Sequence, residues 1–282
     1  MDPAPAPSAA PAATAPARVF DAHLHLIDPA FPLTANDGYV PQPFTAADYQ
    51  ARIAPLPVAG GAVVAGSFQR LDTSWVAPAL AQLGPGFRAV VNLSPAVADA
   101  ELDGELDALH AAGARALRIN LFRGGAWEAE QLDRLARRAF DRVGWHTEFY
   151  ADVAALGRDE RLMAVLTGLP RITVDHFGMS EAREALLRLV AAGAVVKATG
   201  LGRIDIADPA ALTAAILAEN PAGLMFGSDL PSTRARRPYT PADAQDIAAW
   251  AGPHAPAVMW GTGAALYGAP EPETAGQPEP AA

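Results

Sequence analysis

The stretch Phe20-Asp21-Ala22-His23-Leu24-His25 ends an apolar run with two histidines that are separated by one residue. Side chains alternate between two faces along a β-strand, so His23 and His25 are expected to leave the same face, about 6.6 Å apart along the backbone. Two imidazoles at that spacing can converge on one metal ion, water molecule or substrate. The pair stands where a core strand runs out into a loop, which is where α/β enzymes place their chemistry.

Seven more β-rich runs follow this one, and each strand is succeeded by a helical pattern. The predicted strands are 18–25, 60–67, 87–94, 115–122, 146–151, 171–177, 194–200 and 223–229. The predicted helices are 46–54, 74–83, 98–112, 127–142, 152–167, 180–192, 208–219 and 241–251, with a last one near 256–267. Eight strand and helix pairs in about 250 residues predict a single (β/α)₈ TIM barrel. An open doubly wound sheet is the alternative, but no Gly-x-Gly-x-x-Gly or P-loop motif follows an early strand.

Composition limits the classes of function. The chain has 282 residues, 51% of them hydrophobic, and no cysteine, so disulfides and thiolate metal sites are excluded. A net charge of -10 disfavours nucleic acid and anionic membranes as partners. Lys197 is the one lysine, and the other basic residues are arginines, which suit forked contacts with carboxylates.

The two ends of the chain differ from its body. Residues 1–17 are mostly Ala and Pro, residues 269–282 are rich in Pro, Glu, Ala and Gly, and neither segment can bury a core face. We therefore expect two disordered tails around one domain, 18–268. The first tail lacks the basic start and apolar run of a signal peptide, and no segment suits a membrane span, which predicts a cytoplasmic protein.

Polar side chains gather at the predicted strand ends, which meet at one mouth of a barrel. They are His23, His25, Arg118, Asn120, Tyr150, Asp175, His176, Arg203 and Asp229, with Arg123 in the loop just beyond the fourth strand. Each has a structural explanation too: Asp229 could cap a turn, Arg118 could pair with an acid, and His176 could be a satisfied core histidine. Their joint placement on one predicted face favours a functional site. The long connection from Asp28 to Phe44 adds Tyr39, either over this mouth or as a plain surface aromatic.

The available chemistry is hydrolytic. The chain lacks a Gly-x-Ser-x-Gly elbow and has no thiol, so activated water is the expected nucleophile. Asp229 is placed to accept its proton as a general base, while an imidazole or a metal polarises the carbonyl under attack.

Four motifs carry a family resemblance. They are the first-strand run above, Val174-Asp175-His176-Phe177-Gly178, Val196-Lys197-Ala198-Thr199-Gly200 and Phe226-Gly227-Ser228-Asp229-Leu230-Pro231. Over residues 18–268 the chain resembles the amidohydrolase superfamily, and more narrowly its amidohydrolase 2 branch of lactonases and related hydrolases. The resemblance implies that His23, His25, His176 and Asp229 are catalytic. It also implies that Arg118, Arg123, Tyr150 and Arg203 bind an anionic substrate, a carboxylate-bearing lactone opened without a metal.

The sequence departs from the superfamily in two places. Arg118 and Asn120 stand where many members hold two metals through a lysine or glutamate, so a binuclear centre is not expected. The loop 232–237 lacks the histidine often found two residues beyond the aspartate. One alternative is a zinc or other mononuclear hydrolase or decarboxylase with His23, His25, His176 and Asp229 as metal ligands. A second is a non-catalytic barrel that binds an acidic metabolite.

Overall fold

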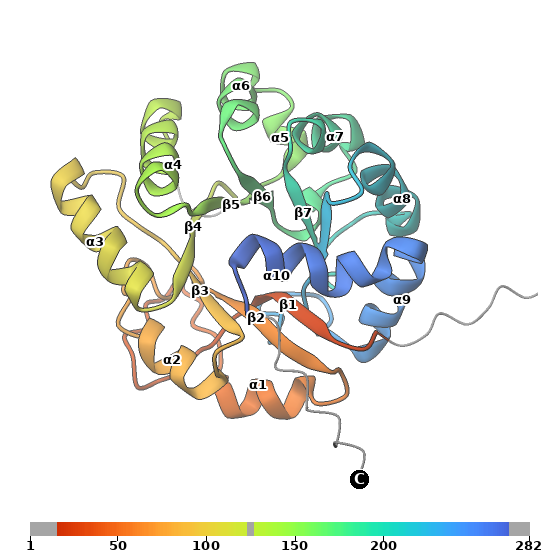
Figure 1. Ribbon diagram of the computed structural model, residues 1–282, viewed down its shortest axis with the longest axis horizontal. Helices are drawn as coiled ribbons and strands as arrows, with labels where there is room; N and C mark the ends of the chain where they lie inside the picture. Colours follow the sequence, from red (N-terminus) through yellow and green to blue (C-terminus); the bar gives the residue numbers. More distant parts are fainter. Residues whose placement is uncertain (1–15, 123–126, 271–282) are drawn as a thin grey trace, which may run out of the picture.

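The computed structural model describes residues 16–122 and 127–270, and in it eight parallel strands follow one another in sequence order around a barrel (Figure 1). The strands are β1 (Val19–Leu24), β2 (Val58–Val64), β3 (Phe87–Val91), β4 (Ala114–Asn120), β5 (His146–Tyr150), β6 (Ile172–Val174), β7 (Val195–Ala198) and β8 (Leu224–Phe226). This arrangement confirms the predicted single (β/α)₈ barrel. The predicted tails lie almost wholly outside the described residues, so their disorder stays a prediction.

Helices surround the strands and follow the predicted pattern. They are α1 (Ala46–Ile53), α2 (Val76–Leu83), α3 (Asp99–Ala111), α4 (Ala129–Val143), α5 (Val153–Leu156), α6 (Glu160–Gly168), α7 (Arg183–Ala191), α8 (Pro209–Glu219), α9 (Pro241–Ala251) and α10 (Thr262–Tyr267), with short 3₁₀ turns η1 (His176–Met179) and η2 (Gly252–His254) and a π turn η3 (Ala257–Gly261). In α4 the buried positions Leu132, Leu135, Ala136 and Ala139 recur at helical spacing and face the sheet. None of the described helices is long and apolar enough to cross a membrane.

One predicted helix, 152–167, is two helices in the structure. α5 ends at Leu156 with Gly157 as its C-cap, and the Asp159 side chain accepts a hydrogen bond from the Leu162 amide and so begins α6. An N-cap aspartate stabilises a new helix start, because it satisfies an amide that has no partner in the first turn. The apolar periodicity continues through the break and hides it.

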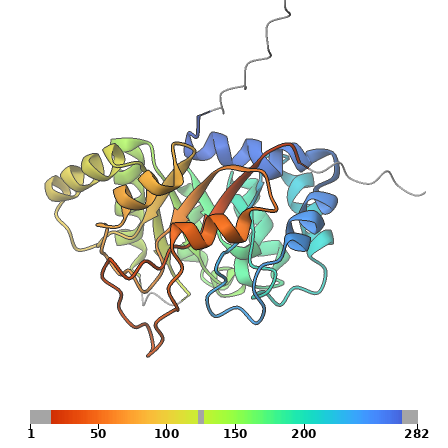
Figure 2. The same cartoon turned by 90° about the horizontal axis from the view of Figure 1, so that it is seen from below.

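The two ends of the barrel differ. α10 lies across one end, and the long connection after β1 projects from the other (Figure 2). Tyr267 of α10 stacks on Phe20 with ring centroids 5.4 Å apart, and Trp260 meets the same ring edge-on at 6.1 Å. Apolar side chains therefore close one end, which leaves the loop-bearing end for a site.

The seam between β1 and β8 brings the first strand motif against the last. The Asp229 amide donates to the His23 carbonyl at 2.8 Å, and the His25 amide donates to the Leu230 carbonyl at 2.7 Å. Asp21 strengthens this seam, because its carboxylate accepts from the Ser228 amide at 2.7 Å and from the Ser228 hydroxyl at 2.6 Å. The backbone of the seam thus places Asp229 beside His23.

Candidate active site

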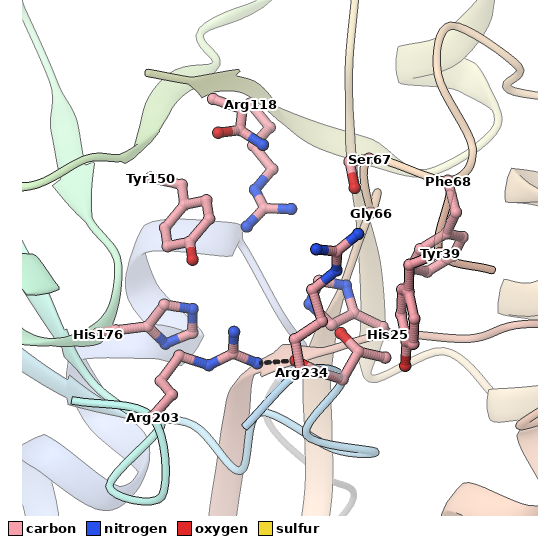
Figure 3. Close-up of a pocket in the computed structure, with 12 residues that line it drawn as sticks. His25, Tyr39, Gly66, Ser67, Phe68, Arg118, Tyr150, His176, Arg203 and Arg234 are labelled. Atoms are coloured by element: carbon pink, nitrogen blue, oxygen red, sulfur yellow. Dashed lines mark hydrogen bonds between the residues drawn. The ribbon is translucent and has the colours of Figure 1, made fainter. Parts of the chain in front are cut away.

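A cavity opens to solvent at the loop-bearing end of the barrel, with about 510 Å³ of empty space that includes part of the open solvent (Figure 3). It is lined by His25, Tyr39, Gly66, Ser67, Phe68, Arg118, Asn120, Tyr150, His176, Arg203, Thr233 and Arg234. Six of the residues expected at the strand ends are in this lining: His25, Arg118, Asn120, Tyr150, His176 and Arg203. Asp229 and His23 lie beneath it, and Arg123 falls outside the described residues.

Asp229 is a buried carboxylate that is held by an arginine. Nε of Arg203 donates to its Oδ2 at 2.7 Å, and Nη2 donates to its Oδ1 at 3.0 Å. Burial raises the pKa of Asp229, and the Arg203 charge opposes that rise only in part. Its backbone has a φ of 60°, and that of His176 a φ of 50°, in the left-handed region that non-glycine residues avoid. Local strain of this kind is common at functional sites.

Two histidines, His23 and His176, face this carboxylate, and His25 lies beside His23. Nε2 of His23 and Nε2 of His176 each lie 4.0 Å from Oδ1 of Asp229. The ring of His23 lies 5.0 Å from that of His25 and 4.7 Å from that of His176, centroid to centroid. Distances of 4.0 Å are too long for direct hydrogen bonds, so one oxygen atom between the three groups would be within reach of each.

His25 and His176 are neutral in this environment. Burial lowers the pKa of both well below the usual value, and neighbouring positive charges add to the effect. Nδ1 of His25 lies 2.7 Å from the Val64 carbonyl, which can only accept, so Nδ1 carries the proton and Nε2 presents a lone pair. Nδ1 of His176 shares a hydrogen bond of 2.6 Å with the Thr199 hydroxyl.

A buried network of charged side chains surrounds Nδ1 of His23, and two of its members, Lys197 and Glu148, were not among the predicted site residues. Nζ of Lys197 lies 3.3 Å from Nδ1 of His23 and donates to Glu148 at 2.6 Å. Asp175 lies 3.3 Å from the same nitrogen and accepts from Arg118 at 3.1 Å. Lys197 and Glu148 are fully buried in strands. The one lysine of the chain, in the middle of an apolar strand, was the signal for this network.

The aromatic and cationic wall of the cavity is built as one packed group. The Arg118 guanidinium lies 5.4 Å from the centre of the Tyr150 ring, which meets the His176 ring edge-on at 5.4 Å. Tyr39 lines the cavity, so it lies over the mouth of the barrel, as one of its two interpretations predicted, and is not a plain surface aromatic. Arg234, which sequence reasoning passed over, lies beside Tyr39. Its only sequence signal was its place in the loop after the last strand.

The buried donor atoms fit a single divalent cation in their chemical type. Donor atoms of His23, His176 and Asp229 lie within 4.8 Å of one another. Nε2 of His23 has no hydrogen-bond partner among residues 16–122 and 127–270. Imidazole and carboxylate donors suit zinc and similar ions, although Arg203 already contacts both oxygens of Asp229. His25 is not part of this donor group.

Comparison with known proteins identifies the family. A family model described as amidohydrolase matches residues 20–269. The chain belongs to the amidohydrolase family. This amidohydrolase-family chain is 29% identical over 168 residues to a 2-pyrone-4,6-dicarboxylate hydrolase from Comamonas testosteroni. That alignment covers 58% of the chain and 52% of the relative, so the chain spans about half the length of the relative it matches.

Solved structures show the same fold. An apo crystal structure of an Agrobacterium tumefaciens protein superposes with a TM-score of 0.77 and 21% identity, covering 90% of this chain and 97% of that one. A "probable 2-pyrone-4,6-dicarboxylic acid hydrolase" from Acinetobacter baumannii, with citric acid bound, gives 0.74 and 19%, covering 89% and 99%. The (β/α)₈ barrel is therefore the fold that these proteins share with this chain.

Proposed function

We propose that this amidohydrolase opens a carboxylate-bearing lactone, with Asp229 as the general base that activates water. The observation that carries the proposal is the convergence of Asp229 Oδ1 with Nε2 of His23 and Nε2 of His176, each 4.0 Å away. A water or substrate oxygen between them can bond to all three groups. The name of the Comamonas relative supports the substrate class, and so does the citric acid in the Acinetobacter structure.

The reaction follows from the protonation of these groups. The lone pair on Nε2 of His25 accepts a hydrogen bond from the water and orients it, and Asp229 removes the other proton of the water as its oxygen bonds to the ester carbonyl carbon. In this proposal the Thr199 hydroxyl donates to Nδ1 of His176, so that Nε2 of His176 carries a proton that stabilises the developing oxyanion. Nε2 of His23, whose Nδ1 lies 3.3 Å from both Lys197 and Asp175, faces the same position. The ring C–O bond then breaks, and the departing oxygen takes its proton from Asp229.

The expected anchors for the acid groups are Arg118, Arg203 and Arg123, with Asn120 and Tyr150 beside them. A guanidinium binds a carboxylate through two parallel hydrogen bonds. Arg118 and Arg203 also hold Asp175 and Asp229. Their role in substrate binding is therefore proposed as a second task, in addition to the ion pairs that they already make.

Replacing the base tests the proposal. Asp229→Asn should lower kcat on 2-pyrone-4,6-dicarboxylate by about 100-fold or more, because an amide cannot accept the proton. Asparagine keeps the shape and one acceptor for Arg203, so the variant should fold with reduced stability, as checked by circular dichroism. Asp205→Asn is the matched control, because Asp205 is an exposed carboxylate that pairs with Arg236 on the surface. A kcat for Asp229→Asn close to that of the control would remove Asp229 from the mechanism.

A second candidate is a mononuclear metal-dependent hydrolase or decarboxylase, favoured by the donor group of His23, His176 and Asp229. A metal bound there would supply a Lewis acid for the substrate carbonyl. The first proposal predicts the same kcat before and after dialysis against a chelator. Loss of activity on dialysis that zinc restores would favour the metal enzyme, and release of carbon dioxide would identify a decarboxylase.

A further inference from the structure

Among the described residues three arginines line the cavity, and two of them pair with buried aspartates. Arg203 pairs with Asp229 through two hydrogen bonds, and Arg118 pairs with Asp175 at 3.1 Å. Both arginines are at least nine-tenths buried. A substrate carboxylate that approaches either one therefore meets a guanidinium whose charge is already balanced by an aspartate.

Arg234 differs from both of these arginines. Among residues 16–122 and 127–270, no acidic side chain forms an ion pair with it. Its guanidinium lies 4.5 Å from the centre of the Tyr39 ring, and its Nη2 donates to the Asn36 carbonyl. Both side chains are part of the cavity lining, and Figure 3 shows the guanidinium of Arg234 beside Tyr39 at the mouth.

These contacts hold the charge in place without cancelling it. A ring face attracts a cation but does not neutralise it, and a carbonyl uses one of the five N–H donors of the guanidinium. The connection after β1 supplies Tyr39 and Asn36, and the loop after β8 supplies Arg234. The two segments thus build one oriented cationic group above the buried site.

We propose that Arg234, stacked on Tyr39, is a carboxylate-binding subsite that selects substrates with an acid group remote from the ester carbonyl. This inference rests on the proposed lactone hydrolysis and adds a specificity determinant to it. The carboxylate receives two charge-assisted hydrogen bonds from the donors of Arg234 that the Asn36 carbonyl does not use. No covalent step is involved.

Citrate binding measured by calorimetry tests the subsite without any turnover. Arg234→Gln should raise the Kd for citrate by about 10-fold or more, because a charge-assisted contact is lost. Arg236→Gln is the matched control: it makes the same charge change two residues away, where the side chain pairs with Asp205 at 2.7 Å. It should change Kd by less than about 2-fold. Arg234→Lys should fall between the two, since it keeps the charge and loses the fork.

The aromatic partner gives a second, independent pair of variants. Tyr39→Phe keeps the ring face and should bind citrate like the wild type, whereas Tyr39→Leu removes the ring and should weaken binding by several-fold. Equal Kd values for Arg234→Gln and Arg236→Gln would overturn the inference, and so would absence of citrate binding by the wild type at millimolar concentrations. If binding depends on Arg234 but no lactone is hydrolysed, the subsite stands and the proposed activity fails.

Discussion

Two sets of ion pairs in this molecule use similar side chains in opposite environments. On the outside, Asp99, Asp103 and Asp107 of α3 meet Arg134, Arg138 and Arg142 of α4, one pair per helical turn. Inside the barrel, Lys197 meets Glu148, Arg118 meets Asp175 and Arg203 meets Asp229. The outer side chains are 21–53% exposed, and the inner ones at most 10%.

This difference in exposure decides what each set does. Water screens the outer pairs, so each contributes little to stability and the ladder mainly keeps two neighbouring helices solvated and in register. The inner pairs have lost their water, and each charge depends on its partner. Burial thus turns an ordinary ion pair into a constraint on the position of His23 and Asp229, the groups that the proposed reaction uses.

The largest expected effect breaks an inner pair. Lys197→Met should lower the free energy of unfolding by about 3–5 kcal/mol, because Glu148 is left buried without its cation. Arg138→Met, which removes an outer arginine from Asp103, should leave the urea midpoint close to that of the wild type. Urea titrations followed by circular dichroism compare the two variants. If Lys197→Met is too unstable to purify, Glu148→Gln tests the same pair, and similar midpoints for inner and outer variants would contradict the comparison.

A second effect comes from acid. Burial keeps the pKa of His25 and of His176 low in the folded chain, while the unfolded chain titrates near 6.5. Below that pH the unfolded state binds more protons than the folded state. The contribution of the two histidines to the free energy of unfolding is therefore fully present above pH 6.5 and is lost as the pH is lowered. Lowering the pH from about 7.5 to about 5.5 should cost about 3 kcal/mol for the two groups together. The raised pKa of Asp21 and of Asp229 has the opposite effect on the free energy of unfolding. Above pH 3.8 the folded state holds these protons more tightly than the unfolded state, so their contribution falls as the pH rises.

Unfolding measured at several pH values checks this effect. His176→Asn removes one of the two groups and should flatten the slope by up to about 1.4 kcal/mol per pH unit. A slope equal to that of the wild type would show that His176 is not held neutral.

The smallest effect concerns salt. Asp103→Asn removes the carboxylate that Arg138 contacts twice at 2.6 Å on the surface. Any loss of stability at low ionic strength should disappear in about 1 M salt, where charges are screened within about 3 Å. Glu148→Gln should keep its full loss at the same salt concentration, because its pair is buried. Urea titrations at two salt concentrations separate the cases, and a salt-independent loss in Asp103→Asn would place the outer pairs in the same class as the inner ones.

Much of the fold could be predicted from sequence, because its signals are local. Most strands are short, largely apolar runs, and each of the eight predicted strands has a counterpart in the structure, although β6 and β8 have three residues where seven were predicted and β2 and β4 begin earlier than predicted. The break between α5 and α6, at Gly157–Asp159, was not predicted, because the apolar periodicity of 152–167 continues through it and an aspartate can stand inside a helix as well as at its N-cap. Six of the predicted strand-end residues line one cavity for a topological reason: parallel strands in a barrel bring their ends to one mouth.

The partners within the site could not be predicted in the same way. That Arg203 would bind Asp229, or Arg118 would bind Asp175, depends on side-chain directions across strands far apart in sequence. The place of Arg234 in the loop after the last strand did not reveal its partner, because Tyr39 lies 195 positions earlier in the chain. Residue spacing along one strand predicts the face of the strand from which a side chain projects. The charged partner of that side chain can be identified only in the folded barrel.

The seam between β1 and β8 has a consequence for how activity and integrity are linked. The backbone bonds that join the first and last strands, from Asp229 to His23 and from His25 to Leu230, also assemble the proposed catalytic group. An opening confined to this seam would separate the base from its imidazoles while the rest of the barrel kept its core. Local openings need less free energy than global unfolding. The proposed activity would then be lost when this seam opens, before a melting curve detects any global unfolding.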